Sequence, residues 1–410
     1  MKVLHTADWH LNDKLGRQDR TDHLQQRIEQ VAGICDREAV DVLVVAGDLF
    51  SELATAAQVT ESFRHLRRTF AGFFGRGGTI LGVTGNHDQD GRVRPFIELA
   101  RSGIDLAEPP RNRGDLFLPG KMYLLDTAFV GRVHDPRDKF DMQFVLLPFP
   151  SHSRLLAGTE TATTAGQLHR SIQDTVGSWV RDLPQMPGYD PRLLTVLVAH
   201  LHVSGADIGR GMFRVSEESD IILDAAALPT GFAYIALGHV HKPQCLRGLP
   251  HVRYAGSLDR MDFSEQDEAK SVVLVDMGPN GRRCDPVPIP IEPTALVDVT
   301  IDDPHITPET LSAQVPNAKE ALVRIEVGAA ATADASETLN RAIREALPNV
   351  TRIEWQPPAL EDAPAARVVS HGGDIRKSVI DYLERRIPAD DPQRQDLLAL
   401  AARFLDVSAV

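Results

Sequence analysis

The chain has 410 residues, of which 42% are hydrophobic and 25% are charged. This length exceeds that of one ordinary domain, and the composition excludes a disordered or fibrous protein, so we expect a large globular unit with smaller appendages. The formal net charge of −13 argues against an extended basic surface for nucleic acid, although bound divalent cations can make an acidic site locally positive.

The sequence carries no signal for export or membrane insertion. Residues 1–6 lead into a charged stretch without the apolar run of a signal peptide, and no later segment offers about 18 successive apolar residues. Cys35, Cys245 and Cys284 are scattered, with neither a disulfide framework nor a paired metal-ligand spacing. We therefore expect a cytoplasmic protein without a membrane span.

The first part of the chain is predicted to alternate strands and helices. Apolar and β-branched runs predict strands at 2–6, 42–45 and 79–83, and helical periodicity predicts helices at 20–39 and 56–70. Polar residues follow each of these strands, at the sheet edge where ligands bind in α/β folds.

A second set of strands follows. Residues 121–149 are strand-like and rich in turns, 165–183 have helical periodicity, and further strands are predicted at 193–199, 234–237 and 271–277. This number of strands suffices for two sheets packed face to face. The sequence thus predicts a four-layer α-β-β-α sandwich over residues 1–290.

Four prolines between residues 286 and 293 predict an interruption of regular structure and a domain boundary near 290. Residues 291–360 then alternate strand, helix, strand, helix and strand, which predicts a small α/β capping domain. The expected elements are strands 295–301, 321–327 and 350–355 and helices 308–314 and 335–346.

Residues 361–410 are the expected third part of the chain. A linker rich in Pro and Ala, at 356–366, separates it from the capping domain. Two short amphipathic helices are expected at 374–386 and 391–405. Two such helices bury little surface alone. We therefore expect this helix pair to dock on a partner protein, the alternative being that it packs back on the chain's own catalytic part.

Five short signals carry the chemistry, and each follows a predicted strand. They are Asp8-Trp9-His10, Gly47-Asp48, Gly85-Asn86-His87-Asp88, His200 and Gly238-His239-Val240-His241. Any one of them is common by chance, whereas all five in this order are not. Carboxylate, amide and imidazole donors together favour manganese, iron or zinc over calcium, and the adjacent glycines allow sharp backbone turns that let the side chains converge.

At these motifs the chain resembles the calcineurin-like metallophosphoesterases, and within them the SbcD nuclease family, over nearly its whole length. The sequences that carry the resemblance are His5–Leu11, Ala46–Phe50, Ala199–Gly205, Ala236–Pro243, Tyr254–Leu258, and Asp262–Glu265 followed by Lys270. The resemblance implies the four-layer fold, a capping domain that binds DNA, and a helix pair that docks on the SMC-like ATPase SbcC.

The resemblance also implies a pair of divalent metal ions, with manganese as the expected metal. Asp8, His10 and His241 would hold one ion, Asn86, His200 and His239 would hold the other, and Asp48 would bridge the two. Such a pair activates water and neutralises the charge that grows on the phosphate oxygens. His5, His23 and His202 are expected to be structural.

Two further residues have expected catalytic roles. His87 would face the scissile phosphate and either stabilise the transition state or protonate the leaving oxygen. Asp88 could orient the His87 ring, or it could instead cap a helix.

Outside the ligand set, Ser51 and Asn12-Asp13 depart from the family pattern. Five arginines near the motifs could contact phosphates, namely Arg17, Arg20, Arg92, Arg94 and Arg210.

By this resemblance the protein would be a metal-dependent DNA nuclease, acting on double-strand ends as an exonuclease and on single strands or hairpins as an endonuclease. It would be a homodimer bound to SbcC. A stand-alone phosphodiesterase acting on nucleotides or other phosphoesters is the first alternative, although Asp48-Leu49-Phe50-Ser51 lacks the Asp-Arg-Gly extension of phosphatases. The second alternative, a DNA-end scaffold without catalysis, does not fit the complete ligand set.

Overall fold

The computed structural model describes residues 1–88, 106–150, 165–209, 221–328 and 333–355, with a few residues between 383 and 400. The chain divides into two compact units, Met1–Gln356 and Pro357–Val410. All elements below belong to the first unit. The expected linker at 356–366 lies outside the described residues, and so does most of the expected helix pair.

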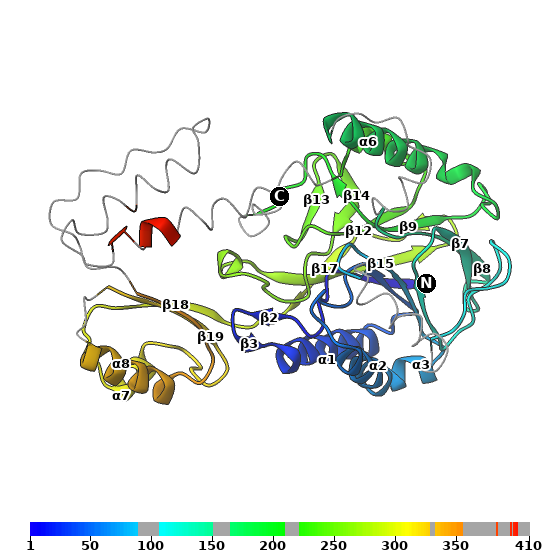
Figure 1. Cartoon of the computed structure of the whole chain (residues 1–410). Coiled ribbons are helices and arrows are strands. Elements are labelled where there is room, and N and C mark those ends of the chain that lie inside the picture. The colour runs from blue at the N-terminus through cyan, green and yellow to red at the C-terminus, as the bar shows by residue number, and fades with distance from the viewer. Residues whose placement is uncertain are drawn as a thin grey trace. The chain divides into compact units, whose positions relative to one another are not determined.

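The first sheet is built around the N-terminal strands. Strands β1 (Lys2–Thr6), β4 (Val42–Ala46), β5 (Thr79–Val83) and β6 (Met122–Leu125) run parallel in the order β1-β4-β5-β6. Strand β15 (Lys270–Gly278) joins β1 in the antiparallel direction. Helices α1 (Thr21–Arg37), α2 (Ala56–Thr69) and α3 (Ala71–Gly75) lie along the side of this sheet away from the second sheet (Figure 1). A capping box of Thr55 and Gln58 fixes the start of α2.

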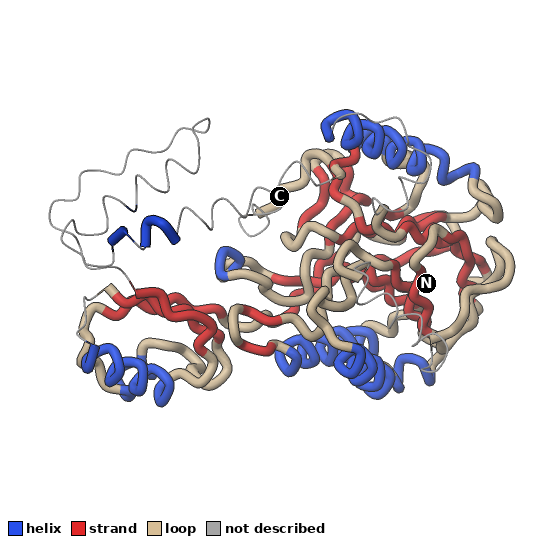
Figure 2. The backbone as a smooth tube through the Cα atoms, viewed as in Figure 1, coloured by secondary structure: helices blue, strands red, loops and turns tan. Residues whose placement is uncertain are grey.

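The second sheet has the order β13-β14-β12-β9-β8-β7. Its strands are β7 (Phe129–Asp135), β8 (Phe140–Leu147), β9 (Thr195–His200), β12 (Tyr234–Gly238), β13 (Gln244–Leu246) and β14 (Leu249–Tyr254). Helix α6 (Ala165–Asp182) covers its outer side, so that strands lie between helices on both sides (Figure 2). This arrangement confirms the four-layer α-β-β-α sandwich.

Successive side chains along each strand point to opposite faces of its sheet, and this explains the layers. In β4, Val42 and Val44 pack against the second sheet, whereas Leu43 and Val45 pack against α1 and α2. Strand β9 follows the same rule: Val196 and Val198 face the first sheet, and Leu197 and Ala199 face α6. Because both faces of these strands are buried, they appear in the sequence as unbroken apolar runs.

A small α/β unit follows the two sheets in the chain. It has three parallel strands, β18 (Leu296–Ile301), β19 (Leu322–Val327) and β20 (Val350–Trp355), with helices α7 (Pro308–Ala313) and α8 (Ala333–Ala346). It has its own apolar core, centred on residues such as Leu311, Ile325 and Ile343. The five expected elements are present, and the exact domain boundaries remain a prediction.

The proline-rich segment differs from expectation. Residues Val287–Ile291 form strand β17, which pairs with β15 over Lys270–Leu274. Regular structure persists because Pro288 and Pro290 lie on an edge strand, where alternate N–H groups are not needed by the neighbouring strand. The remaining short strands are β2 (Lys14–Leu15), β3 (Gln18–Asp19), β10 (His202–Val203), β11 (Ile222–Leu223) and β16 (Gly281–Arg282).

Candidate metal centre

The predicted site residues lie where strands of both sheets end. Asp8 and His10 follow β1, Asp48 follows β4, and Asn86, His87 and Asp88 follow β5; His200 ends β9, and His239 and His241 follow β12. Strands β1, β4 and β5 are parallel to one another, as are β9 and β12. Their carboxyl ends therefore converge on one edge of the sandwich, the usual place for ligands in α/β folds.

The backbone at this edge is strained. Asp8, His10, Asp48 and His239 all have positive φ angles, of 50°, 43°, 50° and 95°. Residues with a side chain rarely adopt this conformation, and it is retained where the surroundings enforce it, often at functional sites. Here the loops after β1 and β4 enforce it through hydrogen bonds from the Asp8 N–H to the Gly47 carbonyl (3.0 Å) and from the His10 N–H to the Asp48 carbonyl (2.9 Å).

Glycines allow these loops to approach closely. A Cβ atom on Gly47 would lie 2.1 Å from Nδ1 of His200, and a Cβ atom on Gly85 would lie 2.0 Å from Oδ1 of Asp48. Both distances are far below contact, so only glycine fits either position.

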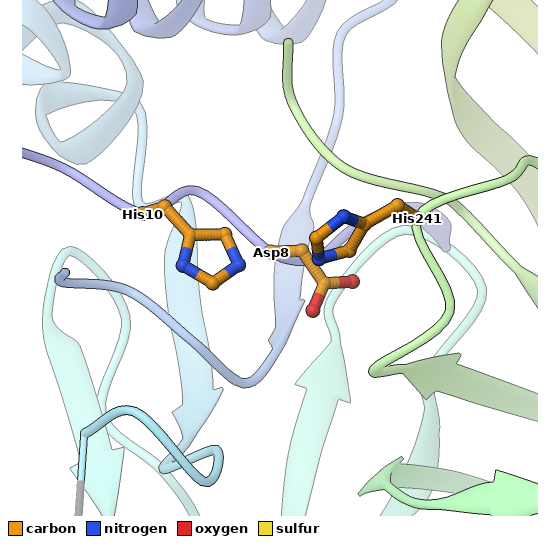
Figure 3. A group of neighbouring side chains, drawn as sticks. All are labelled: Asp8, His10 and His241. Carbon is orange, nitrogen blue, oxygen red and sulfur yellow. The ribbon is translucent and has the colours of Figure 1, made fainter. Parts of the chain in front are cut away.

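The first group of side chains is Asp8, His10 and His241, with one ligand atom of each within 4.8 Å of the others. Figure 3 shows them converging from two separate segments of the chain. Nε2 of His10 is buried and has no hydrogen-bond partner in the described part of the chain. A buried imidazole nitrogen without a partner is costly, and a metal ion at this point would satisfy it.

The second group is Asn86, His200 and His239. Oδ1 of Asn86 lies 2.9 Å from Nε2 of His200 and 3.1 Å from Nδ1 of His239. His200 donates from Nδ1 to the Ala46 carbonyl oxygen (2.8 Å), so a neutral His200 presents a lone pair at Nε2. That lone pair faces the oxygens of Asn86 and Asp48, the latter at 3.4 Å. Acceptors that converge in this way require a cation or a proton between them.

Asp48 lies between the two groups. Ligand atoms of Asp8, Asp48 and His200 lie within 4.8 Å of one another, and so do those of His10, Asp48 and His87. Its Oδ1 accepts a hydrogen bond from the backbone N–H of His87 (2.9 Å). The structure therefore brings all seven predicted ligands together, and the donor set fits a pair of divalent ions. Which ion each residue binds remains a prediction.

The electrostatics of the centre also favour a cation. Burial raises the pKa of Asp8, and burial lowers the pKa of His10 well below its usual range. Burial alone would also lower the pKa of His200, but the nearby carboxylates of Asp48 and Asp8 outweigh it and raise this pKa to about 9. Without a metal, a proton on His200 thus partly neutralises the buried carboxylates, which is the task that a divalent cation performs when it binds.

Asp88 is buried, and its contacts differ from the orienting role considered for it. Its two carboxylate oxygens accept backbone hydrogen bonds from Leu49, Phe50 and Gly85, each 3.0 Å long. These bonds join the loop after β4 to the loop after β5. The carboxylates that approach the His87 ring in the described residues are those of Glu52, 3.6 Å from Nδ1, and Asp48, 4.0 Å from Nε2. Asp88 therefore fixes the loop that carries His87 rather than the ring itself.

The structure also identifies a supporting residue that the sequence did not. Oε1 of Glu265 lies 3.2 Å from Nδ1 of His241. Glu265 belongs to a segment similar to the SbcD family, but that resemblance assigned it no role. In the sequence, only the nearby Lys270 indicated that Glu265 could have a charged partner, and nothing indicated its contact with His241.

The arginines near the motifs have different environments. Arg20 is fully buried, and its guanidinium lies 3.3 Å from Oδ2 of the buried Asp259, so it cannot contact a phosphate. Arg17 is exposed on the loop between β2 and β3. Arg92, Arg94 and Arg210 lie outside the described residues. His5 and His23 make structural contacts, with Tyr234 and with the Glu320 carbonyl respectively.

A four-layer sandwich with clustered Asp, His and Asn side chains at its strand ends defines a metal-dependent phosphoesterase. A family model described as calcineurin-like phosphoesterase matches residues 1–243. The SbcD component of the nuclease SbcCD from Rhodobacter capsulatus is 30% identical over 303 residues, which cover 71% of this chain and 70% of that protein. The same component from Bacillus subtilis is 26% identical over 68% of this chain and 67% of its own length. DNA double-strand break repair protein Mre11 of Aeropyrum pernix is 24% identical over 74% of this chain and 64% of its own length.

The chain therefore belongs to the calcineurin-like phosphoesterase family, and within it to the SbcD family, as the motifs predicted. Its activity is accordingly that of a hydrolase acting on phosphodiester bonds with divalent metal ions. Within the part of the chain that the structure describes, each helix is too short or too polar to traverse a membrane.

Proposed function

We propose that the protein is the nuclease component of an SbcCD-like complex that processes DNA ends in repair and recombination. It acts as an exonuclease on double-strand ends and as an endonuclease on single strands and hairpins. The observation that carries this proposal is the convergence of six donor side chains, in two groups, around a seventh, Asp48. The names of the relatives, nuclease SbcCD and DNA double-strand break repair protein Mre11, support DNA as the substrate.

The two groups would hold one divalent ion each. Asp8, His10 and His241 would form one set, Asn86, His200 and His239 would form the other, and Asp48 would serve both; the short distances among these side chains support this assignment. When bound, such ions supply an activated water and neutralise the charge that develops on the phosphate. The mixed oxygen and imidazole ligands suit manganese, iron or zinc, and we assign manganese among these because the resemblance to the SbcD family implies it.

His87 is the proposed acid. Its side chain is 34% exposed, whereas the neighbouring Asp48 is buried, and its Nε2 lies 4.0 Å from Oδ2 of Asp48. Its ring packs edge-on against the ring of His10, with centroids 4.9 Å apart. The imidazole is thus held beside the centre yet open to a substrate. It would carry a proton to the leaving oxygen as the phosphodiester bond breaks.

We also propose the partners of the protein. The second unit, Pro357–Val410, would dock on the ATPase SbcC, because the SbcD relatives are named as parts of SbcCD. Leu397 and Leu400 in that unit are exposed apolar side chains, as a docking helix requires. The α/β unit of β18–β20 would contribute to DNA binding, the protein would form a homodimer, and it would act in the cytoplasm.

The proposal is tested by comparing wild type with His87→Ala on four substrates. These are a labelled linear duplex, a hairpin, bis-para-nitrophenyl phosphate and a cyclic nucleotide, each with manganese. We expect DNA cleavage in the wild type and a fall of about 10²- to 10⁴-fold in the variant, because a general acid contributes about that much. Manganese binding should be unchanged in the variant, since His87 is outside the two proposed ligand sets.

Two outcomes would change the assignment. Turnover of the small esters without DNA cleavage would favour a stand-alone phosphodiesterase. Full activity of His87→Ala would remove His87 from the mechanism while leaving the metal centre in place.

A further inference from the structure

A buried ion pair lies beside Nδ1 of His241. Glu265 ends the short 3-10 helix Phe263–Glu265, and Lys270 begins β15. Oε2 of Glu265 lies 2.7 Å from Nζ of Lys270, while Oε1 lies 3.2 Å from Nδ1 of His241. Glu265 is 2% exposed and Lys270 is 1% exposed. The carboxylate therefore bridges a buried ammonium group and the imidazole of a proposed metal ligand.

The pair is tied to His241 at two points. Besides Glu265, Nζ of Lys270 donates to the backbone carbonyl oxygen of His241 at 3.0 Å. Nζ also reaches Oε2 of Glu268 at 3.1 Å, and the Met261 N–H donates to Oε2 of Glu265 at 3.1 Å. Both the ring and the main chain of His241 are thus held by the same buried group.

This arrangement fixes the tautomer of His241. A carboxylate accepts only, so the His241 nitrogen beside it must be Nδ1–H. The other nitrogen is then left with its lone pair, and Figure 3 shows a ring nitrogen of His241 facing the Asp8 carboxylate. A histidine that binds metal through one nitrogen commonly donates from the other to a carboxylate, which orients the ring and makes it a stronger ligand.

We propose that Glu265, held in place by Lys270, is a positioning residue that sets the tautomer and direction of the His241 ring and thereby the metal affinity of the Asp8–His10–His241 group. This inference rests on the proposed metal centre, and it does not depend on the substrate. The competing interpretation is a purely structural ion pair, since the loss of one partner of any buried pair is destabilising.

The test uses the full-length chain and manganese alone as the probe. In Glu265→Gln, we expect one of two manganese sites to weaken by about 10- to 100-fold, the usual effect of removing such a support, while the second site keeps its affinity. Titration calorimetry and metal content after dialysis give this result without any activity assay. Glu268→Gln is the matched control, because Glu268 contacts Lys270 but is not a partner of His241.

A second variant separates positioning from stability. In Glu265→Gln the buried Lys270 ammonium keeps only Glu268 as a carboxylate partner. Replacing both members of the pair, Glu265→Gln with Lys270→Met, removes this buried charge and still removes the carboxylate from His241. We expect this double variant to unfold at a denaturant concentration near that of wild type and to retain the weakened site. Wild-type affinity at both sites in a folded Glu265→Gln or double variant would overturn the proposal. Failure of the wild type to bind manganese would instead refute the metal centre, and failure to cleave DNA would refute only the substrate.

Discussion

The close approach of Gly85 to Asp48 makes the centre sensitive to one added methyl group. A Cβ atom at Gly85 would lie 2.0 Å from Oδ1 and 2.5 Å from the backbone nitrogen of Asp48. We expect Gly85→Ala to displace the Asp48 carboxylate and to weaken manganese binding at least tenfold. It should also lower the free energy of unfolding by about 1–3 kcal/mol, the typical cost of overpacking. Calorimetric titration with manganese and urea unfolding in a chelator would measure both effects.

Gly33 provides the control for that substitution. It lies on the exposed side of α1, and a Cβ atom there meets no heavy atom within 4 Å. Because glycine weakens a helix interior, Gly33→Ala should raise the free energy of unfolding by about 1 kcal/mol and leave metal binding unchanged. If both alanine variants bound manganese like wild type, the loop after β5 would not hold Asp48 in the way described.

The sequence predicted the residues of the centre better than it predicted their supports. Each candidate ligand could be found because it follows an apolar strand, and parallel strands bring such positions to one edge. The contacts of Asp88 with Leu49 and Phe50 join positions 39 and 38 residues apart, and Glu265 is 24 residues from His241. No local pattern encodes a hydrogen bond between distant loops, so these contacts required the structure.

Among the elements, β1 and β12 are linked across the two sheets by a buried histidine. His5 in β1 donates from Nε2 to the Leu237 carbonyl oxygen (3.2 Å), and its Nδ1 accepts from the Tyr234 hydroxyl (2.9 Å). Burial lowers the pKa of His5 to about 3; Arg253 acts in the same direction, and the bond to Leu237 opposes it. His5 is thus neutral in the folded protein, whereas an unfolded chain would protonate it below about pH 6.5.

This link predicts how stability changes with pH. The contribution of His5 is complete above about pH 6.5 and is lost as the pH falls towards 3, because only the unfolded state then binds the proton. Between pH 7.5 and pH 5, His5 alone should lower the free energy of unfolding by about 2 kcal/mol. In His5→Gln that part of the decrease should be absent. Urea unfolding of both proteins in a chelator at several pH values would measure the difference, and parallel pH profiles would contradict it.

At the level of elements, the buried strands were the most predictable part of the fold. Strand β4, with both faces covered, is apolar throughout, and β5 is apolar from Ile80 onwards. The proline-rich strand β17 was missed because the prediction treated Pro288 and Pro290 as breakers. An edge strand needs only every second N–H group, so two prolines spaced by one residue can remain in it.

For the whole molecule, the division into two units suggests a division of tasks. Both sheets, the candidate metal centre and the α/β unit lie within Met1–Gln356. We expect a chain that ends at Gln356 to fold, bind manganese and cleave single-stranded DNA as the full-length protein does. It should not bind SbcC, because the proposed docking helices are deleted.

The truncated and full-length proteins can be compared by pull-down with SbcC and by cleavage of a single-stranded oligonucleotide. Normal SbcC binding by the truncated chain would place the docking surface in the first unit. Loss of both metal binding and cleavage would mean that Pro357–Val410 is required for the first unit to fold. The sequence alone could not decide whether the two helices dock on a partner protein or pack on the chain's own catalytic part. An amphipathic helix shows that its apolar face needs to be covered, but not by which surface.

The strand β17 also affects how the folded protein behaves at high concentration. Its register with β15 is continuous from Val287 to Ile291. Because a proline cannot donate to β15, Pro288 and Pro290 take the alternate positions whose backbone faces the outer edge. The outer edge of the strand therefore offers carbonyl acceptors with few donors. Another chain cannot extend the sheet there, which protects an otherwise open β-edge from strand-by-strand aggregation.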